Sequence, residues 1–160
     1  MQINFEEIIA LERENMSPIL ERSGIIFEEY HLREDLLRPH QSIEVRRNDV
    51  LVGLLRYSKT DAVEIKIKSI QLRDPKNNFF ILGELLTKGY LAIRDEKFLK
   101  VSSSALIANI TSQELHCRLG FREAARSEFA ISYEVSKEIL ISSFEELLRP
   151  HLRRRRDGAL

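Results

Sequence analysis

The side chains of this sequence that could do chemistry are few and scattered. Cys117 is the only cysteine, which excludes an internal disulfide, and the four histidines lack the spacing of a metal site. His116 directly precedes Cys117, and an imidazole with an unperturbed pKa of about 6.5 can donate a proton when it is protonated. The alternative is a structural or exposed histidine. No pattern around Cys117 predicts a nucleophile, so we expect no covalent intermediate there.

An irregular strand pattern is the second feature with a chemical consequence. Val63, Ile65 and Ile67 alternate with charged residues, but Ser69 breaks the alternation before Ile70 and Leu72 resume it. A slip of one residue moves the apolar set to the opposite face unless an extra residue is absorbed. We therefore predict a β-bulge near Lys68-Ser69, which would bend the strand. The alternative is a strand that is buried on both faces after Ile67.

The elements that must position these residues follow from periodicity and capping signals. In the N-terminal part we expect a helix at 4–14, a short helix from 15–18 that ends at Gly24, a helix at 27–37 and a hairpin at 42–57 that turns at Asn48-Asp49. A strand at 62–72, a helix at 79–93 and a strand at 98–108 follow, and then a short helix with a capping box at Thr111 and Glu114 and a C-cap at Gly120. The chain continues with one or two strands at 121–135 and a helix at 137–148 that Ser136 caps and Pro150 ends. This order predicts an α+β fold with a mostly antiparallel mixed sheet. The helix at 79–93 would cross over between two parallel neighbours.

Two stretches of this layout resemble the GNAT superfamily of acyl-CoA N-acyltransferases. The first runs from Ile70-Gln71-Leu72-Arg73-Asp74-Pro75 through Asn78-Phe79-Phe80-Ile81-Leu82-Gly83 to Leu86, and it is similar to the family's strand, pyrophosphate loop and helix. The second is Asn109 followed by His116-Cys117-Arg118-Leu119-Gly120-Phe121, which is similar to the family's Asn…Tyr-x-x-Leu-Gly-Phe signature. The resemblance spans roughly residues 42–135. Residues 14–37 also look like the family's paired helices over the acceptor site.

The resemblance implies a GNAT-like sheet with one splayed parallel strand pair and helices on both faces. It implies that the pantetheine arm of acetyl-CoA or another acyl-CoA enters the splayed pair, and that the cofactor contacts a set of strand and loop residues: Ile70, Gln71, Leu72, Asn77, Asn78, Phe79, Phe80, Ile81, Leu82, Gly83 and Asn109. The loop departs from the family pattern, because Phe79 and Ile81 occupy its two small positions and Asn78 its basic or amide position. A bulky Phe79 would crowd the cofactor, whereas both residues could also be simple packing residues.

The chemistry implied by the resemblance is direct attack of an amine on the thioester in a ternary complex, without a metal. Peptide N–H groups around Ile70 and Leu72 would polarise the thioester carbonyl. His116 stands where the family often has a tyrosine that protonates the departing thiolate, so we predict that it is catalytic. The general base is not assigned, because Glu64, Glu44 and His40 are equally placed and each suits an exposed solubilising role. Two alternatives stay open: a catalytically degenerate module that binds a thioester or a protein, and an interaction domain that uses an arginine-rich tail.

Composition limits the class of protein. The 160 residues, 43% hydrophobic and 31% charged with no net charge, predict one cytoplasmic domain and argue against a domain that coats nucleic acid. We divide it into N-terminal helices at 1–41, a sheet and cofactor core at 42–135 and a C-terminal helix at 136–148, all within one domain at 1–148, followed by a basic tail at 149–160. The tail carries five arginines and Asp157, or +4, so nucleic acid binding is expected only through it. No stretch is long enough to span a membrane. The apolar face of the last helix leaves two arrangements open, packing on its own sheet or across a homodimer.

Overall fold

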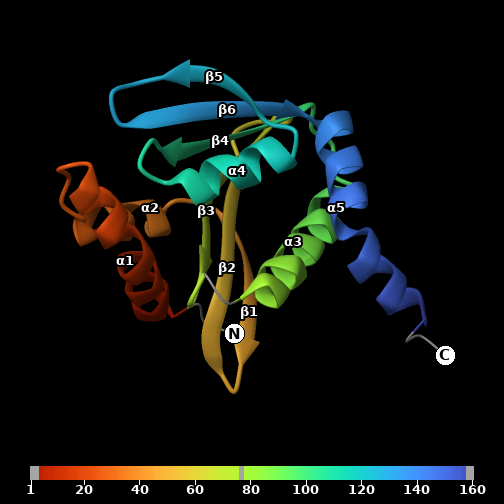
Figure 1. The fold of residues 1–160 in the computed structure, drawn as a ribbon, viewed down its shortest axis with the longest axis horizontal. Helices are drawn as coiled ribbons and strands as arrows, with labels where there is room; N and C mark the ends of the chain where they lie inside the picture. Colours follow the sequence, from red (N-terminus) through yellow and green to blue (C-terminus); the bar gives the residue numbers. More distant parts are fainter. Residues whose placement is uncertain (1–3, 76–77, 158–160) are drawn as a thin grey trace.

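A computed structural model describes residues 4–75 and 78–157 as a six-stranded sheet with helices on both faces (Figure 1). The helices are α1 (Phe5–Arg22), α2 (Glu29–Leu37), α3 (Phe79–Ile93), α4 (Ile110–Arg118) and α5 (Lys137–Asp157). The strands are β1 (Gln41–Arg47), β2 (Val50–Lys59), β3 (Glu64–Leu72), β4 (Lys100–Leu106), β5 (Arg122–Arg126) and β6 (Ala130–Ser136). The α+β class predicted from the element order is confirmed.

The strand order is β1-β2-β3-β4-β6-β5, and β3–β4 is the parallel pair. All other neighbours run antiparallel. The crossover from β3 through α3 to β4 is the predicted one, since parallel neighbours need a long connection. Figure 1 shows the two halves of the sheet turned away from each other, with β1, β2 and β3 in one direction and β4, β6 and β5 in another.

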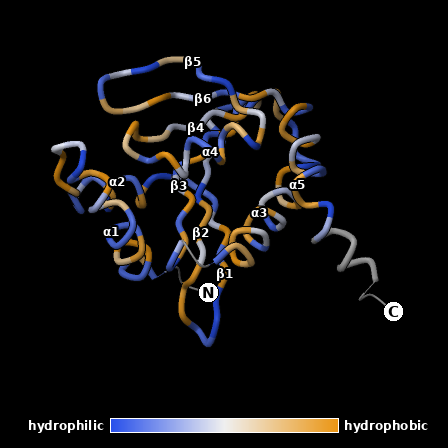
Figure 2. Tube along the Cα trace, viewed as in Figure 1, coloured by the Kyte–Doolittle hydropathy of each residue, from blue (hydrophilic) through white to orange (hydrophobic). Residues whose placement is uncertain are grey.

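Local signals placed several elements correctly. Asn48 and Asp49 both have positive φ, 50° and 64°, as a tight two-residue hairpin turn requires. Figure 2 shows this hairpin as hydrophilic at its tip and hydrophobic along much of β2, which crosses the core. Ser136 caps α5 as predicted, because its hydroxyl accepts a hydrogen bond from the Ile139 N–H. The segment after Phe121 forms two strands, not one, with a turn at residues 127–129.

Three predicted helix boundaries are wrong. α1 runs without a break to Arg22 although it contains Pro18, and α5 runs past Pro150 to Asp157, so the predicted helix ends at 14 and 148 are not observed. The division into one domain and a basic tail stays a prediction. A proline inside a helix removes one backbone hydrogen bond, and the helix can continue beyond it when the neighbouring turns keep theirs. At α4 the cap is Asn109, whose side-chain oxygen accepts from the Ser112 N–H at 3.1 Å; Thr111 lies inside the first turn.

Two cores lie on opposite faces of the sheet. On one face, α1 and α2 pack against β2 through a smaller cluster that includes Ile8, Leu11 and Leu54. On the other, α3, α4 and α5 share a larger cluster with the sheet. Leu140 and Phe144 of α5 belong to this larger core, so the last helix packs within its own chain. A homodimer stays a prediction.

Candidate functional site

The sheet opens between β3 and β4. The two strands pair only from Glu64–Lys66 to Lys100–Ser102, although β3 continues to Leu72 and β4 to Leu106. Residues 67–72 and 103–106 therefore flank a gap in the sheet, and we call it the β3–β4 gap. This is the splayed parallel pair that the resemblance implies.

The predicted bulge lies at the start of this gap. In the pairing with β2, Arg56 lies opposite Ser69 and Tyr57 opposite Ile67, so Lys68 is the extra residue in β3. The bulge keeps the apolar residues on one face, since Ile67 and Ile70 line the same cavity. The alternative also holds, because after Ile67 the strand is buried on both faces: Ser69 and Gln71 are each 8% exposed on the α1–α2 face, and Leu72 is 9% exposed in the larger core.

Backbone groups of both strands point into the gap. The Arg73 N–H donates to the Val52 carbonyl of β2, and backbone groups alternate in direction along a strand, so those of Leu72 and Ile70 point away from β2. The Leu72 carbonyl accepts from Asn15 Nδ2 of α1 at 2.8 Å. The same alternation on β4, where the Ile107 N–H donates to the Phe129 carbonyl, directs the backbone of Ser104 into the gap.

A small apolar cavity of about 40 Å³ lies at the base of the gap. Its lining is largely apolar and includes Tyr57, Ile67, Ile70, Leu86, Val101 and Phe144, with Ser103 and His116 beside them. Gly89 of α3 also lines it, and a Cβ there would meet Leu55 at 2.9 Å, so this glycine lets α3 approach the sheet. The cavity can hold an apolar group next to a buried hydroxyl and a buried imidazole.

His116 is held in one orientation. Its Nδ1 lies 2.6 Å from the Ser112 carbonyl and its Nε2 lies 2.8 Å from Ser103 Oγ. The ring stacks on Tyr133 with centroids 4.5 Å apart and meets Phe121 edge-on. Burial lowers the pKa of His116, and the hydrogen bond to Ser112 only partly offsets this effect. The resting imidazole is therefore neutral at pH 7.

The side chains at the start of α3 differ in burial. Phe79 and Phe80 are each 75% exposed and do not fill the gap. Ile81 is buried on the sheet, and a Cβ at Gly53 would lie 2.8 Å from its Cγ2. Asn78 is the N-cap residue, and its amide nitrogen donates to the Arg73 carbonyl. Ile81 is thus a packing residue, whereas Phe79 projects outward at the helix N-terminus.

The remaining predicted cofactor residues have structural partners or lie outside the described residues. Asn77 falls outside them. Gly83 is buried in α3, where its carbonyl accepts from the Thr87 hydroxyl at 2.7 Å, and Leu82 is half-buried beside it. Gln71 points to the α1 face, where its Oε1 accepts from Asn15. Asn109 Oδ1 is engaged in capping α4.

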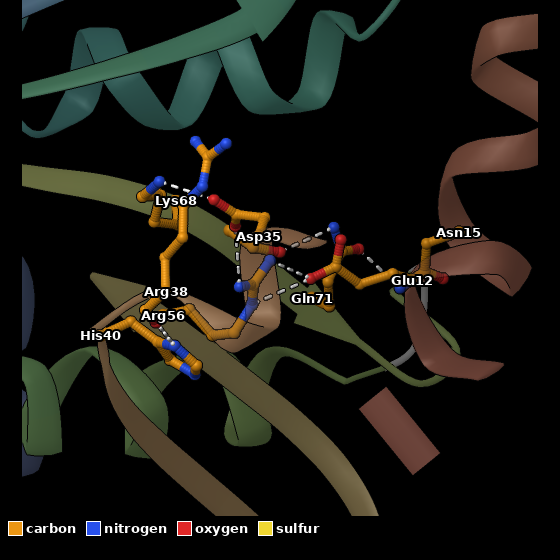
Figure 3. Close-up of polar contacts among 9 residues, drawn as sticks. Glu12, Asn15, Asp35, Arg38, His40, Arg56, Lys68 and Gln71 are labelled. Atoms are coloured by element: carbon orange, nitrogen blue, oxygen red, sulfur yellow. Dashed lines mark hydrogen bonds and ion pairs between the residues drawn. The ribbon is translucent and has the colours of Figure 1, made fainter. Parts of the chain in front are cut away.

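A buried polar cluster on the α1–α2 face escaped the sequence analysis (Figure 3). Arg56 of β2 is 2% exposed, and it donates to Glu12 of α1 at 2.9 Å and to Asp35 of α2 at 3.1 Å. Lys68, the bulge residue, donates to the other Asp35 oxygen at 2.7 Å. Burial acts to raise the pKa of Asp35, but its hydrogen bonds to Lys68 and Arg56 outweigh this, so its pKa lies below the ordinary value. An arginine inside the apolar run at 51–57 is the signal that could have revealed this cluster.

The three residues considered as general bases lie away from the gap. Glu64 sits at the paired start of β3, 4.0 Å from Lys100. Glu44 of β1 accepts from Arg46 at 2.8 Å. His40 Nδ1 lies 2.8 Å from the Arg38 carbonyl on the opposite side of β2 from β3 (Figure 3). None of the three faces the cavity.

Within residues 4–75 and 78–157, no three His, Cys, Asp or Glu side chains are grouped so that they could hold a metal ion. In the same part of the chain, no helix has the length and apolar character that a membrane crossing requires.

Solved structures of known proteins share this architecture. An acetyltransferase from Streptococcus agalactiae superposes with a TM-score of 0.71 at 14% identity, covering 85% of this chain and 94% of its own. The PaiA N-acetyltransferase from Thermoplasma acidophilum in complex with coenzyme A gives 0.62 at 15% identity, covering 82% and 91%. A GNAT family acetyltransferase from Elizabethkingia anophelis with acetyl-CoA bound gives 0.56 at 16%, covering 66% and 82%. No protein-family model matches the sequence, and no curated protein matches it. The chain therefore has the GNAT fold.

Proposed function

We propose that the protein is an N-acyltransferase that moves an acyl group, acetyl in the first instance, from acyl-CoA to an amine. The observation that carries this proposal is the β3–β4 gap, which opens beyond Lys66 and Ser102 and ends in an apolar cavity. A narrow gap with unpaired backbone groups suits the amide-containing arm of a coenzyme A thioester. Structures with the same fold hold coenzyme A and acetyl-CoA, which supports this choice of donor.

Two elements would hold the donor. The backbone N–H groups of Ile70 and Leu72 would bind the pantetheine amides and the thioester oxygen, because they face the gap. The first turn of α3 would receive the pyrophosphate, because helix N-termini favour anions. The residues proposed to line the donor are Ile70, Gln71, Leu72, Asn77, Asn78, Phe79, Phe80, Ile81, Leu82, Gly83 and Asn109. Backbone donors would carry most of this binding, since several of these side chains have structural partners.

His116 would transfer a proton from the attacking amine to the departing thiolate. A departing thiolate needs a proton, and a neutral imidazole has none to spare at Nε2. The attacking amine releases a proton when the C–N bond forms, so His116 would take that proton at Nε2 and pass it to the sulfur. The ring lines the cavity at the base of the gap, which supports a role for it near the reacting end of a bound thioester.

The amine would enter from the face that α1 and α2 cover. The buried polar cluster connects both helices to β2 and to the bulge through Arg56, Glu12, Asp35 and Lys68. It therefore holds α1 and α2 in place on this face of the sheet. Its two cations and two anions balance, and each is already paired. We therefore assign the cluster a positioning role, and we assign no general base among its carboxylates.

A second candidate function is binding of a thioester or of a protein without turnover. The exposed Phe79 and Phe80 favour it, because the family's loop has small residues where Phe79 and Ile81 stand, and because two exposed aromatic rings at a helix N-terminus suit contact with another molecule. The apolar cavity beside Ser103 and His116 favours the enzyme.

Calorimetry and a thiol-release assay test the proposal. The purified protein is titrated with acetyl-CoA, longer acyl-CoA thioesters and free coenzyme A, and then assayed with a panel of primary amines. Micromolar binding together with amine-dependent thiol release supports the transferase. The matched pair His116→Tyr and His116→Phe separates proton transfer from packing, because both are aromatic and only tyrosine can donate a proton.

The outcomes are distinct. We expect His116→Phe to lower the transfer rate by about 10²–10⁴-fold and His116→Tyr to retain more of it. Thioester binding without thiol release in any amine would favour the non-catalytic candidate. Absence of binding to every thioester would refute the transferase and would leave only protein binding from the second candidate.

A further inference from the structure

Ser103 and His116 form a buried hydrogen-bonded pair that the sequence analysis did not foresee. Ser103 is the first residue of β4 beyond the paired segment, and its side chain is buried at the base of the gap. A backbone carbonyl can only accept, so the hydrogen on the His116 ring sits on Nδ1 and is donated to Ser112. Nε2 therefore presents its lone pair to Ser103, and the Ser103 hydroxyl donates to it at 2.8 Å.

This arrangement has the three parts of an activated nucleophile. A hydroxyl lies within hydrogen-bond reach of a base, and a third group fixes the tautomer and direction of that base. Here the third group is the Ser112 carbonyl, and the rings of Tyr133 and Phe121 hold the imidazole on two sides. Both Ser103 and His116 line the apolar cavity. The proposed function brings the thioester carbonyl to this end of the gap.

We propose that Ser103 is a nucleophile activated by His116, and that the protein acylates this serine and hydrolyses acyl thioesters when no amine is bound. The thioester donor of this proposal rests on the proposed function. Ser103 Oγ forms a bond to the carbonyl carbon while His116 Nε2 takes the hydroxyl proton. The C–S bond then breaks, and Nε2 returns that proton to the departing thiolate.

Water completes the cycle. A water molecule attacks the acyl-serine ester, its proton goes to His116 Nε2, and the C–O bond to Ser103 breaks. Nε2 protonates the serine oxygen, so a carboxylic acid leaves and the pair is restored. No oxidant or metal is needed.

A backbone donor is placed for the oxyanion. The N–H of Ser104, the residue after the nucleophile, points into the gap by the alternation along β4. A peptide N–H directly after a nucleophilic serine is a recurring oxyanion donor in serine enzymes. The Ile70 N–H faces the same gap from β3.

Intact-mass analysis with two donors tests the inference. The full-length protein is incubated separately with acetyl-CoA and with p-nitrophenyl acetate, quenched in acid and digested to locate any acetyl group. The ester reports serine reactivity without recognition of coenzyme A. We expect an acetyl group on Ser103 with both donors and slow release of free coenzyme A in the absence of amine.

Variants assign the activity to the pair. Ser103→Ala should remove the adduct and lower hydrolysis at least 100-fold, whereas Ser102→Ala, on the same strand with its side chain on the other face, should leave both in place. His116→Phe should slow acylation by about 10²–10⁴-fold. If Ser103→Ala does not fold, Ser103→Cys keeps the test, because its acyl adduct is a thioester that neutral hydroxylamine cleaves.

The results separate this inference from the proposed function. Calorimetric binding of acetyl-CoA with no Ser103 adduct from either donor overturns the nucleophile and leaves the transferase standing. Acylation of Ser103 by the ester without any thioester binding supports the nucleophile and overturns acyl-CoA as the donor. Neither binding nor adduct overturns both.

Discussion

At the scale of single residues, His116 shows how burial decides a chemical role. Both ring nitrogens are engaged, and burial lowers the pKa of the imidazole. The groups that face the ring are Ser103, Tyr133 and Phe121, and none of them is charged near neutral pH, since burial raises the pKa of Tyr133. His116 is thus a base at rest, and it becomes an acid only after it has received a proton.

The lowered pKa of His116 predicts a pH-dependent stability. Unfolded His116 gains a proton as the pH falls through about 6.5, whereas the folded state resists protonation, so the free energy of unfolding falls below that pH. Chemical unfolding at pH 7.5 and 5.5 should show a larger loss for the wild type than for His116→Phe, by at most about 1.4 kcal/mol per pH unit. Equal losses in wild type and His116→Phe would contradict a depressed pKa.

The position of Phe79 bears on whether this side chain obstructs the cofactor. Its side chain is 75% exposed, so it does not fill the gap, and we predict that it leaves room for the cofactor. Phe79→Ala should therefore change the dissociation constant of acetyl-CoA by less than about threefold, an energy difference below 1 kcal/mol. Calorimetry measures this dissociation constant, and Phe80→Ala, at the neighbouring exposed phenylalanine, is the control variant. A tenfold gain in affinity in Phe79→Ala alone would show that this ring obstructs the donor.

At the scale of elements, the bulge in β3 and the Arg56 cluster act together. Lys68 is the residue that the bulge adds, and its ammonium reaches Asp35 of α2. Arg56, opposite Ser69, reaches Glu12 of α1 and the second Asp35 oxygen. The irregularity that opens the sheet is therefore also a point where both N-terminal helices are attached.

Removing the Arg56 side chain should destabilise the folded protein, because it breaks the ion pairs with α1 and α2. Arg56→Met leaves the buried Glu12 carboxylate and Asp35 without their shared cation, and breaking such a buried pair costs about 3–5 kcal/mol. Denaturant unfolding measures the loss. Arg126→Ala removes an exposed pair with Glu123 and should cost no more than about 1 kcal/mol. Comparable losses in the two variants would mean that the Arg56 cluster does not hold the helices.

At the scale of the whole molecule, the six-stranded sheet consists of two halves that are joined by a short paired segment, which we call the seam. One half is β1, β2 and β3, the other is β4, β6 and β5, and the seam is the pairing of Glu64–Lys66 with Lys100–Ser102 (Figure 1). The larger core spans both halves through α3 and α5, which keeps the gap from widening. The cavity lies where the seam ends.

This construction predicts where a bound donor protects the backbone. The amides of Ile70, Leu72 and Ser104 face the gap, so their hydrogen exchange should slow on addition of acetyl-CoA. The Arg73 amide, which donates to Val52 within the sheet, is the matched control and should change little. Hydrogen–deuterium exchange read by mass spectrometry or NMR measures this. Uniform protection, or none at the gap, would place the donor elsewhere.

Local chemistry determined much of this protein from the sequence alone. The slip between Ile67 and Ile70 predicts the bulge, Asn48-Asp49 the hairpin turn and Ser136 the cap of α5, because each depends on neighbouring residues and on a fixed period. The same local rules misplaced the ends at Pro18 and Pro150, because both helices continue past their proline.

The tertiary structure decided what depends on distant residues. Ser103 meets His116 across 13 positions, and Arg56 meets Glu12 across 44, so no local period could have paired them. Ser103 sits in a run of three serines, and only the strand's facing selects it for the cavity. The length of the gap was likewise set by packing, because strands pair or part according to the cores on either side of them. Sequence fixes local geometry through short-range sterics and hydrogen bonds, whereas a site made of long-range contacts exists only once the chain has packed.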